Sequence, residues 1–352
     1  MRKQWGLWSV VFIFLIFGFG SQVRAAEIKL QGKEPCDLLL TGTIEKGDKE
    51  KIIAAVRAAR KRGYVTGLPK TVLCLDSTGG AYSEALLIVE HFREAGGLTT
   101  YVDANATCYS ACAVVFMGGT SIHNTRHWQG PEPERTLHVM GKLGFHAPYL
   151  TRDTDKAEYV IQAYTEGVQA IAKLAQLKII NSDLLVEMLL RGRDEIFMID
   201  TVDKAGRWGF DLAGTQAQFA VPQMRGQTVL TELSAYIGCN NLYGWRMNDY
   251  SVYRRDISSR CDKPLRAINN KDCWEKQVLR EGGVETSVEY KIRMEGYYGR
   301  TCAIRLSTTH NPEPLSLAWF RENDDENFDQ SVKFWHLLPP ETPLSKIPDL
   351  VK

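Results

Sequence analysis

At the centre of residues 76–119 lies the sequence Thr107-Cys108-Tyr109-Ser110-Ala111-Cys112-Ala113-Val114-Val115-Phe116-Met117-Gly118-Gly119. Upstream, an apolar run rich in strand formers ends at Asp76-Ser77-Thr78-Gly79-Gly80, which indicates a strand that runs into a glycine turn. Apolar residues then recur at helical spacing until Gly96-Gly97, so the turn opens a helix and its backbone amides are free. A second strand, Leu98 to Val102, leads to a second turn of small residues, with Ser110 at the mouth of another apolar helix.

These two neighbouring strand-turn-helix units predict a site for a developing negative charge. The glycine turn offers the amides of Gly79 and Gly80, and the second turn offers the amide of Ala111 beside the hydroxyl of Ser110. An oxyanion hole needs fixed donors of this kind with a nucleophile within reach. The alternative for Ser110 is a small residue packed under a helix start, where a serine also serves as a cap.

Four motifs follow one another along the chain. They are the turn Asp76 to Gly80, the Ser110 turn, Gly144-Phe145-His146-Ala147-Pro148, and the segment Asp203 to Asp211. In this order they resemble the Clp protease proteolytic subunit and its relatives in the ClpP/crotonase superfamily, over about residues 36 to 213. Thr78 departs from the pattern, because the family commonly has proline at that place in its turn.

The resemblance implies an α/β fold of repeated β-β-α units with a mostly parallel sheet. It implies a serine peptidase acting on a peptide or protein, with no metal and no cofactor, and a homo-oligomer. The alternation of strands with helices of ten or more residues independently favours a mostly parallel sheet with right-handed crossovers. One long helical pattern runs from Asp153 to Leu177.

The resemblance also assigns catalytic roles. Ser110 is the expected nucleophile, and His146 matches the family's histidine before a proline, so it is the expected base that takes the hydroxyl proton. Asp194 lies near the place of the family's aspartate and would orient the imidazole, with Glu195 and Asp200 as open alternatives. Four other histidines are weaker candidates and read as surface residues: His91, His123, His127 and His138.

The chain has eight cysteines: Cys36, Cys74, Cys108, Cys112, Cys239, Cys261, Cys273 and Cys302. An even number in an exported chain indicates disulfides, and the spacings fit no structural zinc site. Cys108 and Cys112 flank Ser110, and a bridge between them requires Cys108 to lie outside the helix; buried free thiols and a cysteine nucleophile are the alternatives. In the C-terminal half, the shortest loops predict Cys239 with Cys261 and Cys273 with Cys302.

The first 25 residues have the pattern of a signal peptide. Arg2 and Lys3 precede an apolar core, Trp8 to Phe19, which is shorter than a spanning helix requires. Cleavage predicts a periplasmic or secreted protein without a stable membrane span, and an uncleaved anchor is the alternative. Loss of this segment removes three basic residues and leaves 40 basic and 42 acidic ones, a net charge of −2, which argues against nucleic acid as the main partner.

The remaining length predicts two parts. A ClpP-like domain is expected over 26–214, a linker over 215–234, and a small cysteine-rich and β-rich module or extension over 235–352, within which Glu285 to Met294 alternates as a strand. The proline-containing segment Asn124 to Arg135 is expected to be a loop or excursion beside the site, where substrate selection commonly resides.

Two rival functions remain at the level of sequence. The first is a non-catalytic binding or scaffold protein of the cell envelope, in which the cysteine-rich half recognises a partner. The second is crotonase-like acyl-CoA chemistry, which uses an oxyanion hole without a triad; the predicted export argues against it, because acyl-CoA is an intracellular substrate.

Overall fold

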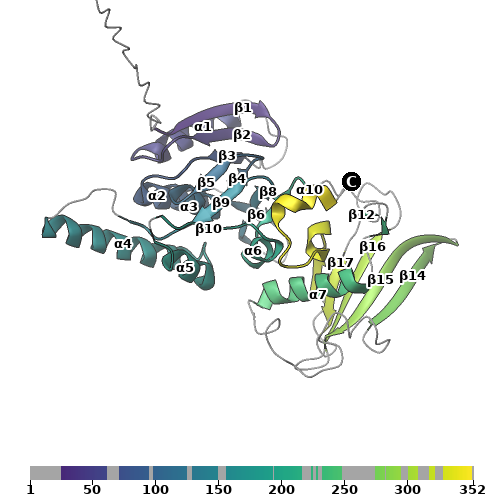
Figure 1. The fold of residues 1–352 in the computed structure, drawn as a ribbon. Helices are drawn as coiled ribbons and strands as arrows, with labels where there is room; N and C mark the ends of the chain where they lie inside the picture. The colour runs from purple at the N-terminus through teal and green to yellow at the C-terminus, as the bar shows by residue number, and fades with distance from the viewer. Residues whose placement is uncertain are drawn as a thin grey trace, which may run out of the picture.

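The structure is a computed structural model, shown in Figure 1. It describes residues 25–61, 71–94, 98–124, 129–149, 156–192, 194–215, 223–224, 227–228, 232–247, 274–281, 283–294, 300–307, 317–321 and 328–350. Within these residues the chain forms a mixed α/β structure with two main sheets and a small three-stranded sheet beside the larger α/β part.

The first sheet has six strands in the order β1-β2-β3-β4-β8-β11. Its members are β1 (Glu27–Lys33), β2 (Cys36–Thr41), β3 (Val72–Asp76), β4 (Thr99–Val102), β8 (Arg135–His138) and β11 (Asp211–Ala213). β1 pairs antiparallel with β2, and every other pair in this sheet is parallel. The prediction of a mostly parallel α/β sheet is therefore confirmed.

Helices cover this sheet because its central strands are apolar along most of their length, as is typical of strands buried on both faces. α1 (Asp48–Lys61) packs on β1 and β2, and α2 (Tyr82–Glu94) packs between α1 and α3 (Ala111–Met117). Every residue of α3 is at most 1% exposed. α3 is thus the central helix of the largest hydrophobic cluster, which also contains Leu38, Leu73 and Leu137 from the sheet.

A small sheet of three strands, in the order β10-β9-β5, carries the candidate site. β5 (Thr107–Tyr109) pairs parallel with β9 (Lys142–Phe145), and β9 pairs antiparallel with β10 (Phe197–Met198). A β-bridge between Ser77 and Cys108 joins the end of β3 to β5. The two predicted turns are therefore held side by side by backbone hydrogen bonds.

The segment after β9 is helical. α4 (Ala157–Leu177) and α5 (Ser182–Leu189) come before β10, and α6 (Val202–Arg207) follows it, with the Thr201 hydroxyl accepting a hydrogen bond from the Lys204 amide at its start. α4 packs on α2, yet four of its apolar side chains are exposed: Val160, Ile161, Tyr164 and Val168. No helix within the described ranges combines the length and apolar character needed to cross a membrane.

The segment predicted as a loop between Asn124 and Arg135 is in part a hairpin. β6 (Thr120–Asn124) pairs antiparallel with β7 (Gln129–Pro133), and β8 then begins at Arg135. Proline removes a ladder donor, so the sequence reads as a loop, but a two-stranded hairpin tolerates proline because each strand has an unpaired edge.

The C-terminal half contains a second sheet, which confirms the predicted β-rich part (Figure 1). Its five antiparallel strands are β14 (Trp274–Glu281), β15 (Val284–Met294), β16 (Arg300–Ser307), β17 (Leu317–Arg321) and β18 (Phe328–Ser331). α7 (Glu232–Met247) packs on β15 and β16. The disulfide Cys239–Cys302 joins α7 to β16.

The predicted pairing of Cys239 with Cys261, and of Cys273 with Cys302, is therefore wrong. Shortest loops are a poor guide here, because the packing of α7 on β16 brings together two cysteines 63 residues apart in sequence. Cys261 and Cys273 themselves lie outside the described residues.

The last described residues of the chain pack against the α/β part formed by the first half. η1 (Phe334–Leu337), η2 (Leu344–Lys346) and α10 (Ile347–Leu350) follow β18, and Phe334, Leu344 and Ile347 belong to the same hydrophobic cluster as the first sheet. The segment predicted as a linker contains the short strands β12 (Gln223–Met224) and β13 (Gln227–Thr228), and α7 begins inside it. The hydrophobic cluster of the first sheet therefore includes residues beyond 235, while a second cluster around α7, β15 and β16 consists wholly of residues from Ala235 onward.

His336 sits in this returning segment and is buried as a neutral side chain. Its Nδ1 accepts a hydrogen bond from the Lys333 amide at 3.0 Å, and its ring lies edge-on to Trp335 and Trp245. Burial, and to a smaller extent the charge of Lys333, lowers the pKa of His336 from 6.5 to about 3. Nothing in the sequence pattern singled out this residue.

The buried histidine predicts a loss of stability in acid. Above pH 6.5 the imidazole is neutral in both the folded and the unfolded chain. Below pH 6.5 the imidazole of the unfolded chain binds a proton, whereas that of the folded chain stays neutral until the pH approaches its lowered pKa. Lowering the pH from 7 to 5 should therefore reduce the free energy of unfolding by about 2 kcal/mol through this group. In urea denaturation at both pH values, His336→Asn should lose less stability than the wild type; equal losses would contradict the assignment.

Candidate active site

Ser110 occupies a strained position between a strand and a helix. β5 ends at Tyr109, α3 begins at Ala111, and Ser110 between them has φ 58° and ψ −124°. Residues other than glycine seldom adopt such angles, at a cost of about 1–3 kcal/mol, and they cluster at functional sites. The observed backbone outlier is therefore a physical reason to examine this residue as a reacting group.

The hydroxyl of Ser110 is not used to cap the helix. Ser110 is the N-cap residue of α3 by position, but its side chain makes no capping hydrogen bond. It is half-exposed, whereas Ala111 and Cys112 beside it are fully buried. The alternative role as a structural cap is thus not what the geometry shows.

The glycine turn packs directly against Ser110. Gly79 has φ 111°, and a Cβ atom on it would lie 2.7 Å from the Ser110 Cβ and 2.8 Å from the Tyr109 carbonyl oxygen. The Ser77 hydroxyl accepts a hydrogen bond from the Gly79 amide at 3.1 Å, which holds the turn. The prediction of a free amide at Gly79 is therefore wrong, because the turn uses this donor itself. Only glycine fits here, both for the backbone angle and for the space.

Among the described contacts, two amides of these turns, those of Gly80 and Ala111, donate to no acceptor. Ala111 is the first residue of α3, and the first amides of a helix have no partner within it. Gly80 is paired with Ile44 in a parallel β-bridge, whose two hydrogen bonds are made by the residues on either side of Gly80. The Ile44 amide donates to the Gly79 carbonyl at 2.8 Å, and the Ala81 amide donates to the Ile44 carbonyl at 2.7 Å. Because successive amides of extended backbone point to opposite sides, the Gly80 amide points away from Ile44.

His146 lies just beyond the strand that pairs with β5. Tyr109 is paired with Gly144, and the Ser110 amide donates to the Gly144 carbonyl at 3.1 Å. Ser110 and His146 therefore follow the same ends of two adjacent parallel strands. In the part of the chain that the structure describes, the Ser110 hydroxyl and the His146 ring form no hydrogen bond with each other, although catalytic hydrogen bonds are often long before substrate binds.

The imidazole of His146 is oriented by its own neighbours. It is 6% exposed, stacks on the Tyr149 ring with a centroid distance of 5.1 Å, and its Nδ1 lies 2.8 Å from the Ala147 carbonyl oxygen. A carbonyl oxygen only accepts hydrogen bonds, so Nδ1 carries the proton and a neutral ring keeps its lone pair on Nε2. This is the tautomer that a general base requires.

Among the described contacts, none joins the His146 ring to the three acids considered for orienting it. Asp194 and Glu195 are exposed in the turn before β10, and Asp200 pairs with Lys204 at 2.6 Å. β10 pairs Phe197 with Phe145. One residue further along this antiparallel register, Ile196, which is apolar, lies opposite His146. Among the described contacts, none joins His146 to Asp194, so the predicted role of Asp194 stays a prediction.

Cys108 and Cys112 form a disulfide around Ser110, as predicted. Cys108 lies in β5, outside the helix, and its Cα is 5.1 Å from that of Cys112. A third disulfide joins Cys36 to Cys74 across β2 and β3, and no described cysteine has a free thiol. The alternatives of buried free thiols and of a cysteine nucleophile at 108 or 112 are therefore wrong.

The other candidate histidines that the structure describes lie on elements other than β5 and β9. His91 lies in α2, His123 lies in β6, and His127 lies outside the described residues. The His138 Nδ1 accepts a hydrogen bond from the Met140 amide, and burial lowers the pKa of this histidine. No group of three metal-binding side chains occurs within the described residues.

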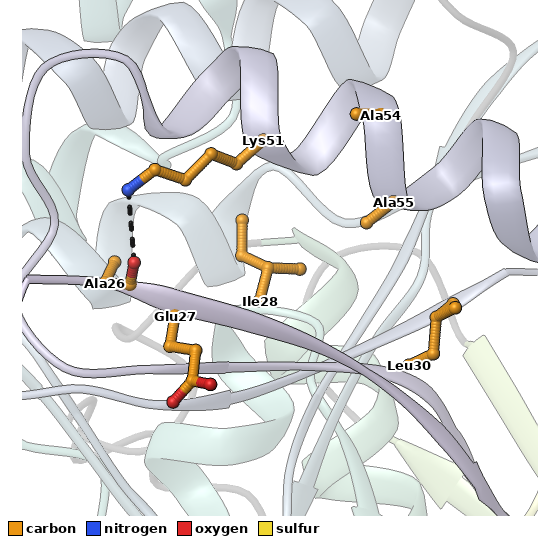
Figure 2. A pocket seen from close by; sticks show the side chains of 7 residues that line it. All are labelled: Ala26, Glu27, Ile28, Leu30, Lys51, Ala54 and Ala55. Carbon is orange, nitrogen blue, oxygen red and sulfur yellow. Dashed lines mark hydrogen bonds between the residues drawn. The ribbon is translucent and has the colours of Figure 1, made fainter.

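A groove on another part of the surface carries no comparable chemistry. It lies between β1 and α1 and is lined by Ala26, Glu27, Ile28, Leu30, Lys51, Ala54 and Ala55 (Figure 2). Most of these side chains are apolar. The Lys51 ammonium is bound to the Ala26 carbonyl at 3.2 Å and to Asp48 at 2.6 Å, so it is already engaged.

The sequence was compared with protein-family models and with curated proteins. Neither comparison found a match.

The packing of Gly79 against Ser110 predicts an asymmetric response to alanine. Gly47 also has a positive φ, 98°, but a Cβ there would meet nothing within 4 Å. Gly47→Ala should lower the free energy of unfolding by about 1–2 kcal/mol through its backbone angle alone. Gly79→Ala should cost a further 1–3 kcal/mol or so from the steric overlap with Ser110. Urea denaturation measures both, and equal losses would show that the Gly79 contact is not tight.

Proposed function

We propose that this protein is a ClpP-like serine hydrolase that acts on peptides or proteins outside the cytoplasm. The observation that carries the proposal is Ser110, held at φ 58° with a hydroxyl that does not cap α3, next to Ala111 in sequence and packed against Gly79. A protein gains no stability from a strained serine whose hydroxyl caps nothing. Such a residue is expected where the hydroxyl has a chemical task.

In the proposed reaction the Ser110 Oγ attacks a substrate carbonyl carbon while His146 Nε2 takes the hydroxyl proton. The carbonyl oxygen becomes an oxyanion and accepts hydrogen bonds from the Gly80 and Ala111 amides. His146 then gives the proton to the leaving amine, and the acyl group remains on Ser110 until water, activated by the same ring, releases it. Loss of one such oxyanion donor typically reduces the rate about 100- to 1,000-fold.

The imidazole needs a partner that holds its tautomer. The Ala147 carbonyl, 2.8 Å from Nδ1, is suited to this role. The proposal therefore centres on Ser110 and His146, with Asp194 as the third member that the resemblance implies.

The finer features of the proposal rest on the resemblance and on composition. They are the repeated β-β-α units, the peptide substrate, the cleaved signal peptide and the homo-oligomer. The three disulfides support an oxidising compartment, because such bonds are rare in the cytosol. The exposed apolar side chains of α4 support the homo-oligomer, because contact with a second copy of the chain would bury them.

One observation favours the alternative of a non-catalytic binding or scaffold protein. It is the absence, within the described structure, of a hydrogen bond between the Ser110 hydroxyl and the His146 ring. If that separation does not close when substrate binds, the fold presents a strained serine without a base.

A fluorophosphonate probe separates the two functions, because it reacts with an activated serine. We expect the wild type to be labelled and Ser110→Ala to be unlabelled, while Ser182→Ala, at the exposed start of α5, should behave as the wild type. His146→Ala should lower the labelling rate by about 100- to 10,000-fold, the usual contribution of a general base. No labelling of the folded wild type at any pH would support the scaffold instead.

The orienting group can be tested with the same probe. If the Ala147 carbonyl holds the ring, Asp194→Asn should be labelled at close to the wild-type rate, because that exposed side chain does not touch His146 in the described structure. A large loss in Asp194→Asn, without a change in melting temperature, would instead place Asp194 in the reacting conformation. Glu187→Gln, which removes a partly buried ion pair with Arg191, is the control.

A further inference from the structure

We propose that the Cys108–Cys112 disulfide is a positioning element that assembles the Ser110 site only after the chain has been oxidised. The inference rests on the proposed function of Ser110. It concerns how that site is switched on, which the chemistry of hydrolysis itself does not require.

The place of this bond differs from that of the other two. Cys36–Cys74 links the paired strands β2 and β3, and Cys239–Cys302 links α7 to β16 across 63 residues. Cys108–Cys112 spans four positions and encloses only Tyr109, Ser110 and Ala111. Because the stabilisation from a disulfide grows with the loop that it closes, this bond contributes least to overall stability and most to local geometry.

The bond and the strained turn depend on each other. Side chains four residues apart in a regular helix have their Cβ atoms about 5–6 Å apart, whereas a disulfide needs roughly 3.5–4.5 Å. The bond therefore forms only when Cys108 lies in β5 and the chain bends at Ser110. Conversely, once formed, it excludes the competing conformation in which α3 extends backwards and Ser110 relaxes to helical angles.

Without the bond, three backbone hydrogen bonds remain to hold the turn. The Tyr109 amide donates to Ser77, the Ser110 amide donates to Gly144, and the Val114 amide donates to Ser110, at 3.1, 3.1 and 3.2 Å. These keep the fold but not the strained angles of Ser110, which cost free energy that a relaxed turn recovers. The reduced chain should therefore fold with its hydroxyl displaced from the Gly80 and Ala111 amides.

The oxidation is an ordinary thiol–disulfide exchange. The Cys108 thiolate attacks one sulfur of an oxidised low-molecular-weight disulfide and releases one thiolate; the Cys112 thiolate then attacks the mixed bond and releases the second. Two electrons pass to the oxidant, and the two protons lost by the cysteines end on the released thiols or in solvent. Both sulfurs belong to residues with 0% exposure, so the bond forms during folding and is then protected. The device is a one-time activation, coupled to arrival in an oxidising compartment.

Matched removal of two disulfides tests this role. C108A/C112A should be labelled by the fluorophosphonate about tenfold more slowly or worse, because small displacements of a reacting group are costly. C239A/C302A, which removes the longer loop, should lose more thermal stability yet keep the wild-type labelling rate. Equal labelling rates in folded C108A/C112A and wild type would overturn the inference while leaving the serine hydrolase intact. No labelling of wild type would instead overturn both.

A second measurement decides the matter if C108A/C112A does not fold. Wild type is unfolded with reductant, refolded without oxidant, and then treated with oxidised glutathione. The labelled fraction should rise in step with the Cys108–Cys112 bond, measured by peptide mass spectrometry. Full labelling before that bond appears would contradict the proposal.

Discussion

The candidate site depends on the backbone pairing of Ser77 with β5. The Ser77 amide donates to the Thr107 carbonyl at 2.6 Å, and the Tyr109 amide donates to the Ser77 carbonyl at 3.1 Å. These bonds join the end of the parallel sheet to the small sheet, so the two turns that follow β3 and β5 meet. Gly79 can then approach Ser110 and the amide nitrogen of Ala111.

The strain at Ser110 is tolerated because its surroundings are tightly fixed. α3 is buried along its whole length, the turn is hydrogen-bonded to β9 on one side and to Ser77 on the other, and the Cys108–Cys112 bond closes around it. Unfavourable backbone angles persist only where interactions with the surrounding structure hold the residue in place and outweigh the cost of the strain. The same rigidity is what an oxyanion hole needs, since its donors must be in place before charge develops.

Local patterns were most informative where short-range chemistry decides the structure. The glycine turn, the Ser110 turn, the parallel sheet and the Cys108–Cys112 bridge all follow from residues close together in sequence. The pairing of Cys239 with Cys302 and the burial of His336 did not, because both arise from α7 packing against segments about 60 or more residues away. The hairpin β6–β7 was predicted as a loop, because its prolines cannot donate ladder hydrogen bonds and its partner strand is not recognisable from the local sequence.

The sequence by itself determined that a strand, a glycine turn and a turn bearing Ser110 follow one another along the chain, because hydrophobic period and turn chemistry are local properties. Only the tertiary structure decided that Ser110 is strained and does not cap α3, that the Ala147 carbonyl contacts the His146 ring, and that the chain's end packs into the first core. The first two facts depend on how β5 and β9, which pair Thr107 with Lys142, come into register, and the third depends on contacts between distant parts of the chain; no local pattern encodes either.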